Sequence, residues 1–266
     1  MRFLYLTLGW LLLALATFEL NAAKIAIVID DIGYKSSDKR LLDLDAKLTY
    51  AVLPHTPLGY QYAKDAVQSN REVIIHLPMQ ANKNNRLLGP GALTHEMTKQ
   101  EYQQTLLSAL EDIPFAIGVN NHMGSLLTRQ EEPMAWTMEL LRQHQLFFLD
   151  SKTTRHSKIE AVADQYGVDS LARNIFLDHD RNKQAIERQF RRLVRIAKKH
   201  GQAIAIGHPY SETREVLEQQ LARLSEMNVE LVPLSHLLPA PAYLVKSDQP
   251  AQTQQAVNTA SSVAPQ

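Results

Sequence analysis

KIAIVIDDIGYK, residues 24–35, places five consecutive apolar residues after a lysine, and the run ends at two adjacent aspartates. An apolar run without alternating polar residues indicates a strand that is buried on both faces, as in a parallel sheet covered by helices. Asp30 and Asp31 therefore lie where a buried strand ends. Because two neighbouring carboxylates make each other harder to ionise, the pair calls for a specific chemical reason.

The same short pattern recurs along the chain, with an apolar, β-branched run that stops at Asp, Asn or His. The runs are IAIVIDD (25–31), LTYAVLPH (48–55), EVIIHLPM (72–79), FAIGVNNH (115–122), LFFLDS (146–151), NIFLDHD (174–180), AIAIGHP (203–209) and VELVPLSH (229–236). Most are separated by segments with apolar residues at three- and four-residue spacing, which predicts helices at 98–111, 132–144, 181–200 and 212–226. Alternating strands and helices predict an α/β fold.

This alternation between residues 24 and 238 predicts a distorted (β/α) barrel of seven or eight parallel strands, with an open doubly wound sheet as the alternative. In both architectures the carboxyl ends of the strands meet at one edge, where loops build the active site. The polar residues that end the runs are therefore expected around one rim: Asp30, Asp31, His55, His76, His122, Asp150, Asp178, His208 and His236. Histidine is not a favoured helix cap, so its repeated use at strand ends indicates chemistry.

Composition excludes several kinds of function. Lys and Arg together number 28, as do Asp and Glu, so no basic field indicates nucleic-acid binding. The chain has no cysteine, which excludes disulfides, thiolate metal sites and cysteine nucleophiles. It contains neither the G-x-S-x-G elbow of a serine hydrolase nor the glycine-rich motifs of nucleotide enzymes. Metal-dependent hydrolysis is the reaction class that these tests leave.

The two ends of the chain differ from its centre. Residues 1–23 have an early arginine, an apolar stretch and small residues at the end, which predicts a secretory signal peptide, with an N-terminal membrane anchor as the alternative. Residues 239–266 are rich in Gln, Ala, Ser, Thr and Pro, which predicts a disordered tail. We therefore expect one folded domain, 24–238, that is exported to the periplasm or secreted and has no membrane span after signal cleavage. The sequence does not indicate the oligomeric state.

Histidines and a carboxylate around an open rim form the ligand set of a catalytic zinc or a similar divalent ion. Such a metal lowers the pKa of bound water and polarises a carbonyl group. Because neighbouring residues at a strand end point to different sides, one aspartate can bind the cation while the other acts as a base. The cation would also offset the repulsion between Asp30 and Asp31.

Taken together, these motifs resemble those of the divergent polysaccharide deacetylases, carbohydrate esterases of the NodB-homology type, over essentially all of residues 24–238. In VIDDIG (28–33) the resemblance implies that Asp30 is the catalytic base and Asp31 a metal ligand. In the family's H-x-x-x-H ligand pair, His76 matches the first histidine, but Gln80 stands at the second position. Since a neutral amide is a poor zinc ligand, we expect His122 of NNHMGS (120–125) to be the third ligand.

Two later motifs complete the resemblance. AIGHP (205–209) is similar to the motif whose histidine is the general acid, which implies that role for His208. FFLDS (147–151) lies near the position of the aspartate motif that orients this histidine, which implies that role for Asp150. NNHMGS falls where the larger family has an R-x-P-Y motif, whose arginine holds the catalytic base, and it contains no arginine.

The three polar residues that end the run at 174–180 are interpreted differently. Asp178, His179 and Asp180 precede a predicted helix, so helix capping and the helix dipole explain at least one of them fully, and we place all three outside the catalytic set. The resemblance as a whole implies a divalent metal, first of all zinc, and removal of acetyl groups from an N-acetylated glycan such as peptidoglycan. The alternative is an inactive glycan-binding or scaffold protein that retains the deacetylase fold.

Overall fold

The computed structural model describes residues 22–239 of the protein. The predicted signal peptide, 1–23, lies outside this range except for its last two residues, and the predicted tail, 239–266, lies outside it except for its first. Among the described residues, no helix is both long and apolar enough to cross a membrane.

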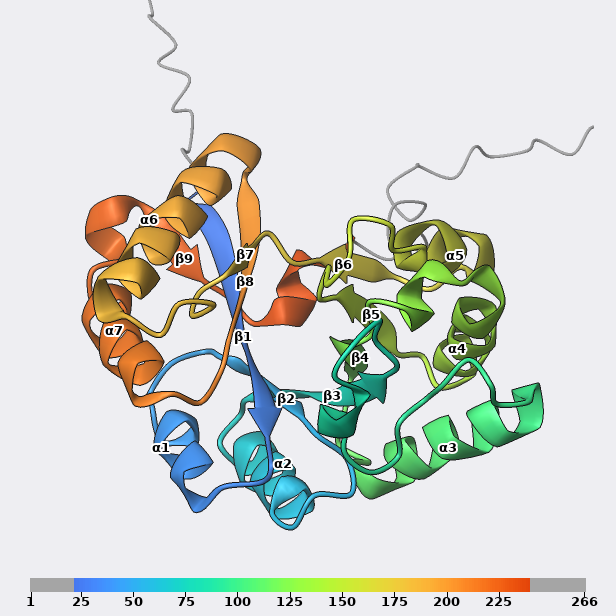
Figure 1. Ribbon diagram of the computed structural model, residues 1–266. Helices are drawn as coiled ribbons and strands as arrows, with labels where there is room; N and C mark the ends of the chain where they lie inside the picture. Colours follow the sequence, from blue (N-terminus) through green and yellow to red (C-terminus); the bar gives the residue numbers. More distant parts are fainter. Residues whose placement is uncertain (1–21, 240–266) are drawn as a thin grey trace, which may run out of the picture.

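A single curved sheet of parallel strands forms the centre of the described domain, and helices surround it (Figure 1). The strands are β1 (Ala23–Ile32), β2 (Thr49–Val52), β3 (Glu72–Met79), β4 (Gly118–Met123), β5 (Phe147–Asp150), β6 (Ser170–Ala172), β7 (Ile175–Phe176), β8 (Gln202–Gly207) and β9 (Val229–Leu231). Their order across the sheet is β6-β5-β4-β3-β2-β1-β8-β7, and β9 pairs with β1. This order follows the chain around a barrel and does not reverse as in a doubly wound sheet.

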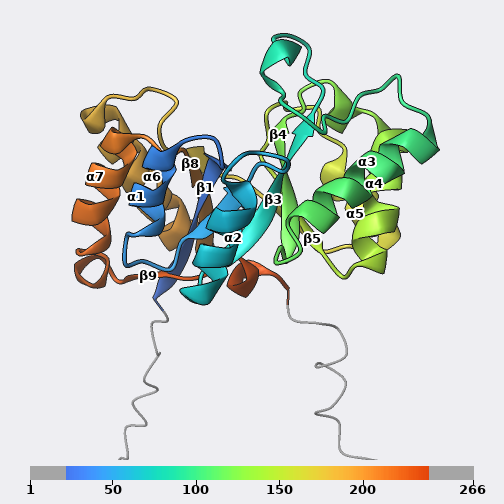
Figure 2. The same ribbon diagram turned by 90° about the horizontal axis from the view of Figure 1, so that it is seen from below.

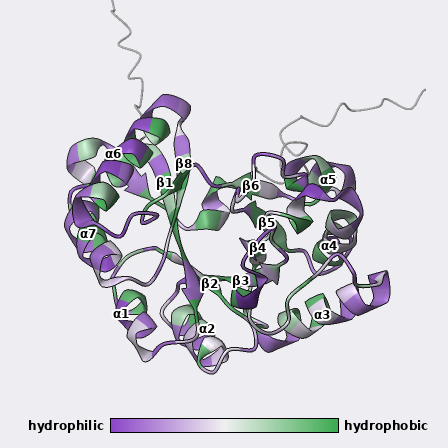
Figure 3. Cartoon of the chain, in the orientation of Figure 1, coloured by the Kyte–Doolittle hydropathy of each residue, from purple (hydrophilic) through white to green (hydrophobic). Residues whose placement is uncertain are grey.

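The predicted distorted (β/α) barrel is therefore confirmed, and the doubly wound alternative is wrong. The sheet has nine strands where seven or eight were predicted, because the short β6 had no apolar run to mark it. As the sequence predicts, β1 is buried on both faces. Figure 3 shows the hydrophobic colour along most of this strand. Ile25, Ile27 and Ile29 pack under the helices, whereas Ala26 and Val28 belong to a smaller core inside the barrel.

The helices are α1 (Lys39–Leu42), α2 (Gly59–Gln68), α3 (Lys99–Asp112), α4 (Glu131–Gln143), α5 (Ile159–Tyr166), α6 (Lys183–His200) and α7 (Ser211–Leu221). Figures 1 and 2 show α3, α4 and α5 together on one side of the sheet and α6 and α7 on the other. Three of the four predicted helices agree with the structure to within two residues at each end. The fourth, predicted at 212–226, ends at Leu221, and a separate short 3₁₀ turn, Ser225–Met227, follows.

One segment of the chain changes partners as it crosses from one end of the strand order to the other. β6 pairs with β5 and β7 pairs with β8, and because only Arg173 and Asn174 separate β6 from β7, the two cannot pair with each other. We call residues 170–177 the β6–β7 segment: the backbone N–H of Arg173 donates to β5 and that of Asn174 to β8. The Arg173 side chain lies at this change of partner, where its Nε and Nη2 donate to the carbonyl oxygens of Ser151 and Lys152, at 2.6 and 2.9 Å. The guanidinium carbon also lies 3.7 Å from the centre of the Phe176 ring.

Candidate metal and catalytic site

The carboxyl ends of four strands bring the site together. Asp30 and Asp31 come from the end of β1, His76 from β3 and His122 from β4, while His208 directly follows β8. These five side chains line one cavity of about 220 Å³. Residues far apart in the chain thus meet where parallel strands end, as the alternating pattern predicts.

An unusual backbone conformation lets both aspartates line the cavity. Asp31 has a φ of 60°, in the left-handed region that few residues other than glycine adopt. The register between β1 and β2 shifts in the same place, between Ile29 and Ile32. The chain therefore turns at Asp31, and its carboxylate does not point to the opposite face from Asp30, as it would in a regular strand.

Asp31, His76 and His122 form a compact cluster of possible metal ligands, with one donor atom of each within 4.8 Å of the others. Asp31 Oδ1 lies 3.1 Å from His76 Nε2 and 3.1 Å from His122 Nδ1. This oxygen is buried and, among the described residues, has no hydrogen-bond partner of good geometry. Two imidazole nitrogens beside an unsatisfied buried carboxylate oxygen are a donor set that suits zinc or a similar divalent ion. The residues present therefore fit such a metal.

The charges in the cluster point to the same conclusion. Burial acts to raise the pKa of Asp31, but the nearby imidazoles of His122 and His76 hold this pKa well below its usual range. Burial acts to lower the pKa of His76, but Asp30 and Asp31 raise this pKa above its ordinary value. The cluster thus favours positive charge next to Asp31, and either protons or a bound cation can provide that charge.

Asn120, on β4, forms hydrogen bonds with both His76, a predicted ligand, and Asp30, the predicted base. It is fully buried, and its Nδ2 donates to Asp30 Oδ1 at 2.8 Å. Its Oδ1 must then accept the hydrogen bond from His76 Nδ1, also at 2.8 Å. That bond places the proton of a neutral imidazole on Nδ1 and leaves Nε2 with its lone pair facing Asp31, which a metal ligand requires. The NNHMGS segment has no arginine to hold Asp30, and Asn120 of this segment makes a hydrogen bond to Asp30 instead.

Asp30 is almost completely buried, and burial raises its pKa from the usual range, although the charges of His76 and His208 partly oppose this shift. Its Oδ2 lies 3.6 Å from His76 Nε2. A carboxylate with a raised pKa is a better proton acceptor near neutral pH than an ordinary one. The environment of Asp30 thus suits a base.

Asp178, and not Asp150, contacts the histidine of the late motif. His208 Nδ1 donates to Asp178 Oδ1 at 2.8 Å, and the His208 backbone N–H donates to Asp178 Oδ2 at 2.6 Å. Asp150 instead accepts from the backbone N–H of Lys152 at 2.7 Å and lies near the Lys152 ammonium. The structure therefore does not bring Asp150 to His208, and it gives the orienting position to a residue that the sequence analysis interpreted as a cap.

The order of the strands explains this correction. Strand β7 pairs with β8, so Asp178, two residues after β7, lies opposite His208, one residue after β8. Strand β5, which ends at Asp150, lies elsewhere in the sheet. Helix α6 begins later than predicted, and the side chain of Asn182 caps it by accepting from the Ala185 backbone N–H. Asp178 is thus not needed as a cap.

The contact with Asp178 changes how His208 holds its proton. Burial alone would lower the pKa of His208, but the hydrogen bond and charge of Asp178, with smaller contributions from Asp31 and Asp30, raise it to about 9. His208 is therefore protonated at neutral pH. A protonated imidazole at the edge of a cavity is suited to donate a proton.

Replacing Asp178 with asparagine is expected to lower the pKa of His208 by about 1–3 units, because a neighbouring negative charge is lost. His208 would then lose its proton at a lower pH than in the unmodified protein, where its pKa is about 9. An NMR titration of the imidazole measures this directly. Asp150→Asn is the matched control and should leave the pKa unchanged; an equal shift in both variants would contradict the assignment to Asp178.

Other polar residues that end strand runs lie outside this cavity. His55 contacts Asp112, with 2.7 Å between its backbone N–H and the carboxylate. His236 lies on the 3₁₀ helix η5 (Leu234–Leu237), whose backbone bonds to Thr49 and Glu72, the first residues of β2 and β3. His236 is thus at the opposite end of the barrel, and the expectation of a single rim is wrong for it.

Gln80, at the family's second ligand position, makes different contacts. Its Oε1 accepts from the backbone N–H of His95 at 2.8 Å and from His95 Nδ1 at 2.7 Å. Its Nε2 donates to Glu96. It is not part of the cluster that Asp31, His76 and His122 form.

Comparisons with known proteins agree with the fold and identify a family. A model of the family described as divergent polysaccharide deacetylase matches residues 27–238. The chain is 38% identical over 231 residues to the uncharacterized protein YibQ of Escherichia coli K12. The aligned region covers 86% of this chain and 72% of YibQ. Its structure resembles that of an uncharacterized protein from Agrobacterium tumefaciens C58, with a TM-score of 0.78 and 20% identity, over 82% of this chain and 90% of that one. It also resembles a CE4 family pseudoenzyme from Bacillus anthracis, with a TM-score of 0.51 and 16% identity, over 82% of this chain and 66% of that one.

Proposed function

Because the chain belongs to the divergent polysaccharide deacetylase family, we propose that it is an exported, metal-dependent hydrolase that removes acetyl groups from an N-acetylated polysaccharide. The observation that supports this most is the cluster of Asp31, His76 and His122 beside a buried Asp30 and a charged His208. Cell-wall glycan such as peptidoglycan is the nearest large source of such a substrate for a protein that a signal peptide at 1–23 exports.

Zinc, which Asp31, His76 and His122 would hold, supplies when bound a Lewis acid that polarises the acetamide carbonyl and lowers the pKa of water. Asp30 accepts a proton from the water that attacks the carbonyl carbon. His208, protonated at neutral pH, donates its Nε2 proton to the amide nitrogen as the C–N bond breaks. Asp178 keeps the His208 ring in place by accepting from Nδ1. The products are acetate and a free amino sugar.

Replacing Asn120 with alanine is expected to weaken metal affinity by about 10–100-fold, the usual effect of losing a residue that orients a ligand. His76 would lose the partner that fixes its tautomer, and Asp30 the donor that holds its Oδ1. Acetate release should fall as well. Competition with a chromophoric chelator measures the affinity without relying on turnover.

Asn121→Ala is the matched control for this change. Asn121 is an equally buried amide on the same strand, but it bonds to the backbone of Met123 and Ser151 and not to Asp30 or His76. This variant should retain its metal affinity even if it is less stable. Equal losses in both variants would indicate a general effect of disturbing β4.

A second candidate function is glycan binding without turnover. Two observations favour it: Gln80 makes no contact with the cluster, and an amide, not an arginine, holds Asp30. The experiment that separates the two functions compares metal content and acetate release for acetylated chitooligosaccharides and peptidoglycan fragments. Acetate released only by the metal-loaded protein supports the hydrolase, whereas glycan binding without acetate supports the binding protein.

A further inference from the structure

Three adjoining cavities form a groove that leads away from the metal cluster. The cavity of about 220 Å³ that contains the cluster shares Asp31 and His122 with a second cavity of about 320 Å³. The second shares Arg181, Pro209 and Tyr210 with a third of about 430 Å³. The groove is therefore long enough for more of a substrate than its acetamide group.

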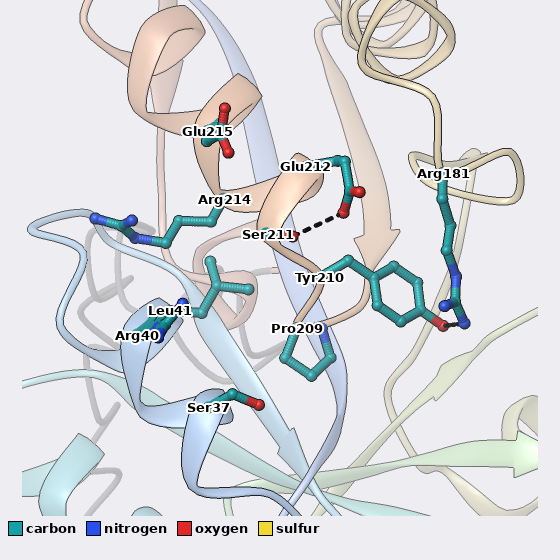
Figure 4. A pocket seen from close by; sticks show the side chains of 10 residues that line it. All are labelled: Ser37, Arg40, Leu41, Arg181, Pro209, Tyr210, Ser211, Glu212, Arg214 and Glu215. Carbon is teal, nitrogen blue, oxygen red and sulfur yellow. Dashed lines mark hydrogen bonds between the residues drawn. The ribbon is translucent and has the colours of Figure 1, made fainter.

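We call the third cavity the α1–α7 cavity, because residues of these two helices form much of its wall (Figure 4). Its lining residues are Ser37, Arg40, Leu41, Arg181, Pro209, Tyr210, Ser211, Glu212, Arg214 and Glu215. Three of them carry a guanidinium group. The chain as a whole has equal numbers of acidic and basic residues, so three arginines around one cavity are a local feature.

Two of these arginines have no direct ion-pair partner. Neither Arg40 nor Arg181 forms an ion pair with any residue between 22 and 239, although Arg181 lies near enough to Glu212 for the two charges to attract. Arg181 lies flat on Tyr210, with its guanidinium carbon 3.7 Å from the ring centre, and donates to the Tyr210 hydroxyl at 2.8 Å. Figure 4 shows this contact at one side of the cavity. Stacking holds the Arg181 guanidinium in place while leaving most of its donors available.

The third arginine and the two acidic residues of the lining already have partners. Arg214 pairs with Glu218, while its Nε is buried without a partner among the described atoms. Glu215 pairs with Lys183, whereas Glu212 accepts from the neutral Ser211 hydroxyl at 3.0 Å and keeps its charge. Against this one carboxylate stand the two arginines without an ion-pair partner, so the charge left for a ligand to meet has an excess of one positive charge.

The middle of the groove has a different character. Tyr34 and Leu87 line it and are 48% and 61% exposed, which is unusual for large apolar side chains in this protein. Tyr210 lies where this cavity meets the next. Flat apolar faces with a hydroxyl at the edge suit sugar rings, which present both C–H and O–H groups.

We propose that the α1–α7 cavity is a subsite for an anionic group, a carboxylate or a phosphate, that the glycan carries beyond its acetylated sugar. The proposal rests on the proposed function, because that function places the acetylated sugar at the metal cluster. Arginine binds both anions through paired N–H donors. The groove thus selects an acidic glycan over a neutral one of the same length.

Binding of two glycans to the metal-loaded, full-length mature protein tests this, with calorimetry as the readout. One is a neutral chitooligosaccharide, and the other is a glycan of equal length with a carboxylate on alternate sugars. Arg40→Gln is expected to weaken binding of the carboxylated glycan by about tenfold, the effect of one charge-assisted hydrogen bond. Binding of the neutral glycan should not change. Arg40 is exposed, so this substitution does not disturb the core.

Lys39→Gln is the matched control. It removes the same charge one residue away, but Lys39 pairs with Asp43 and lines a separate cavity. Equal weakening by both substitutions, or equal affinity of the unmodified protein for both glycans, would overturn the subsite. A phosphorylated glycan is the third ligand: if it binds in an Arg40-dependent way and the carboxylated one does not, the subsite stands and its anion is phosphate.

This experiment separates the subsite from the proposed function, because the affinities are measured with Asp30→Asn present in every variant, a change that keeps the three clustered ligand residues but slows turnover, and acetate release is measured on the protein with Asp30. A preference for the acidic glycan without any acetate release would overturn the hydrolase and leave the subsite intact. Acetate release from both glycans without a preference in binding would overturn the subsite alone.

Discussion

Replacing Asp30 with asparagine is expected to lower the rate of acetate release by about 10²–10⁴-fold, the usual contribution of a general base. Asparagine has nearly the same size as aspartate and can still accept the hydrogen bond from Asn120, but it cannot take a proton from water. Asp30 is not one of the three clustered ligand residues. The variant should therefore keep about one divalent ion per chain.

The comparison that makes this result decisive is Asp31→Asn, which should lose both metal and activity. Metal content by mass spectrometry and acetate release are measured on both variants in parallel. Loss of metal from the Asp30 variant together with retention in the Asp31 variant would mean that the two aspartates have exchanged roles.

Replacing His76 with alanine is expected to reduce metal affinity by more than about 100-fold, and acetate release should fall with it. His76 is the most buried of the three clustered residues, and it contacts both other members, with Nε2 3.1 Å from Asp31 Oδ1 and 3.0 Å from His122 Nδ1. Without it only two ligands are left, fewer than a catalytic zinc site uses. Equilibrium dialysis against the metal gives the affinity.

His95→Ala is a stringent control for this loss. His95 bonds to Gln80, the residue at the family's second ligand position. If Gln80 and His95 held the metal in place of the cluster, His95→Ala would lose the metal and His76→Ala would retain it. Retention of the metal in His95→Ala is the result that the cluster predicts.

The fold could be predicted because its long strands contain continuous apolar runs. β1, β3 and β8 are buried on both faces along these runs, and the helices that follow β3 and precede β8, α3 and α6, have regularly spaced apolar residues. β6 could not be predicted, since its Ser-Leu-Ala sequence is only half-buried and gains its place by pairing with β5. The early end of α7 likewise depends on a turn that no spacing of apolar residues marks.

The sequence predicts which polar residues lie at strand ends, but it does not predict which of them are neighbours in the sheet. That Asp31, His76 and His122 would converge follows from their places at the carboxyl ends of parallel strands. Which aspartate reaches His208 depends on which strand lies beside β8, and local sequence does not contain that information. The role of Asn120 could not be predicted for the same reason. Only the register between β3 and β4 shows that Asn120 lies opposite His76.

The β6–β7 segment has a consequence for unwanted pairing with other chains. An exposed strand edge is a template for pairing with another chain and for aggregation. Each half of this segment pairs on one side only, so the edges that it leaves are very short, with three residues in β6 and two in β7. Arg173 places a bulky positive charge between the two halves and bonds to the carbonyl oxygens of Ser151 and Lys152. The segment therefore offers an incoming strand almost no ladder to extend.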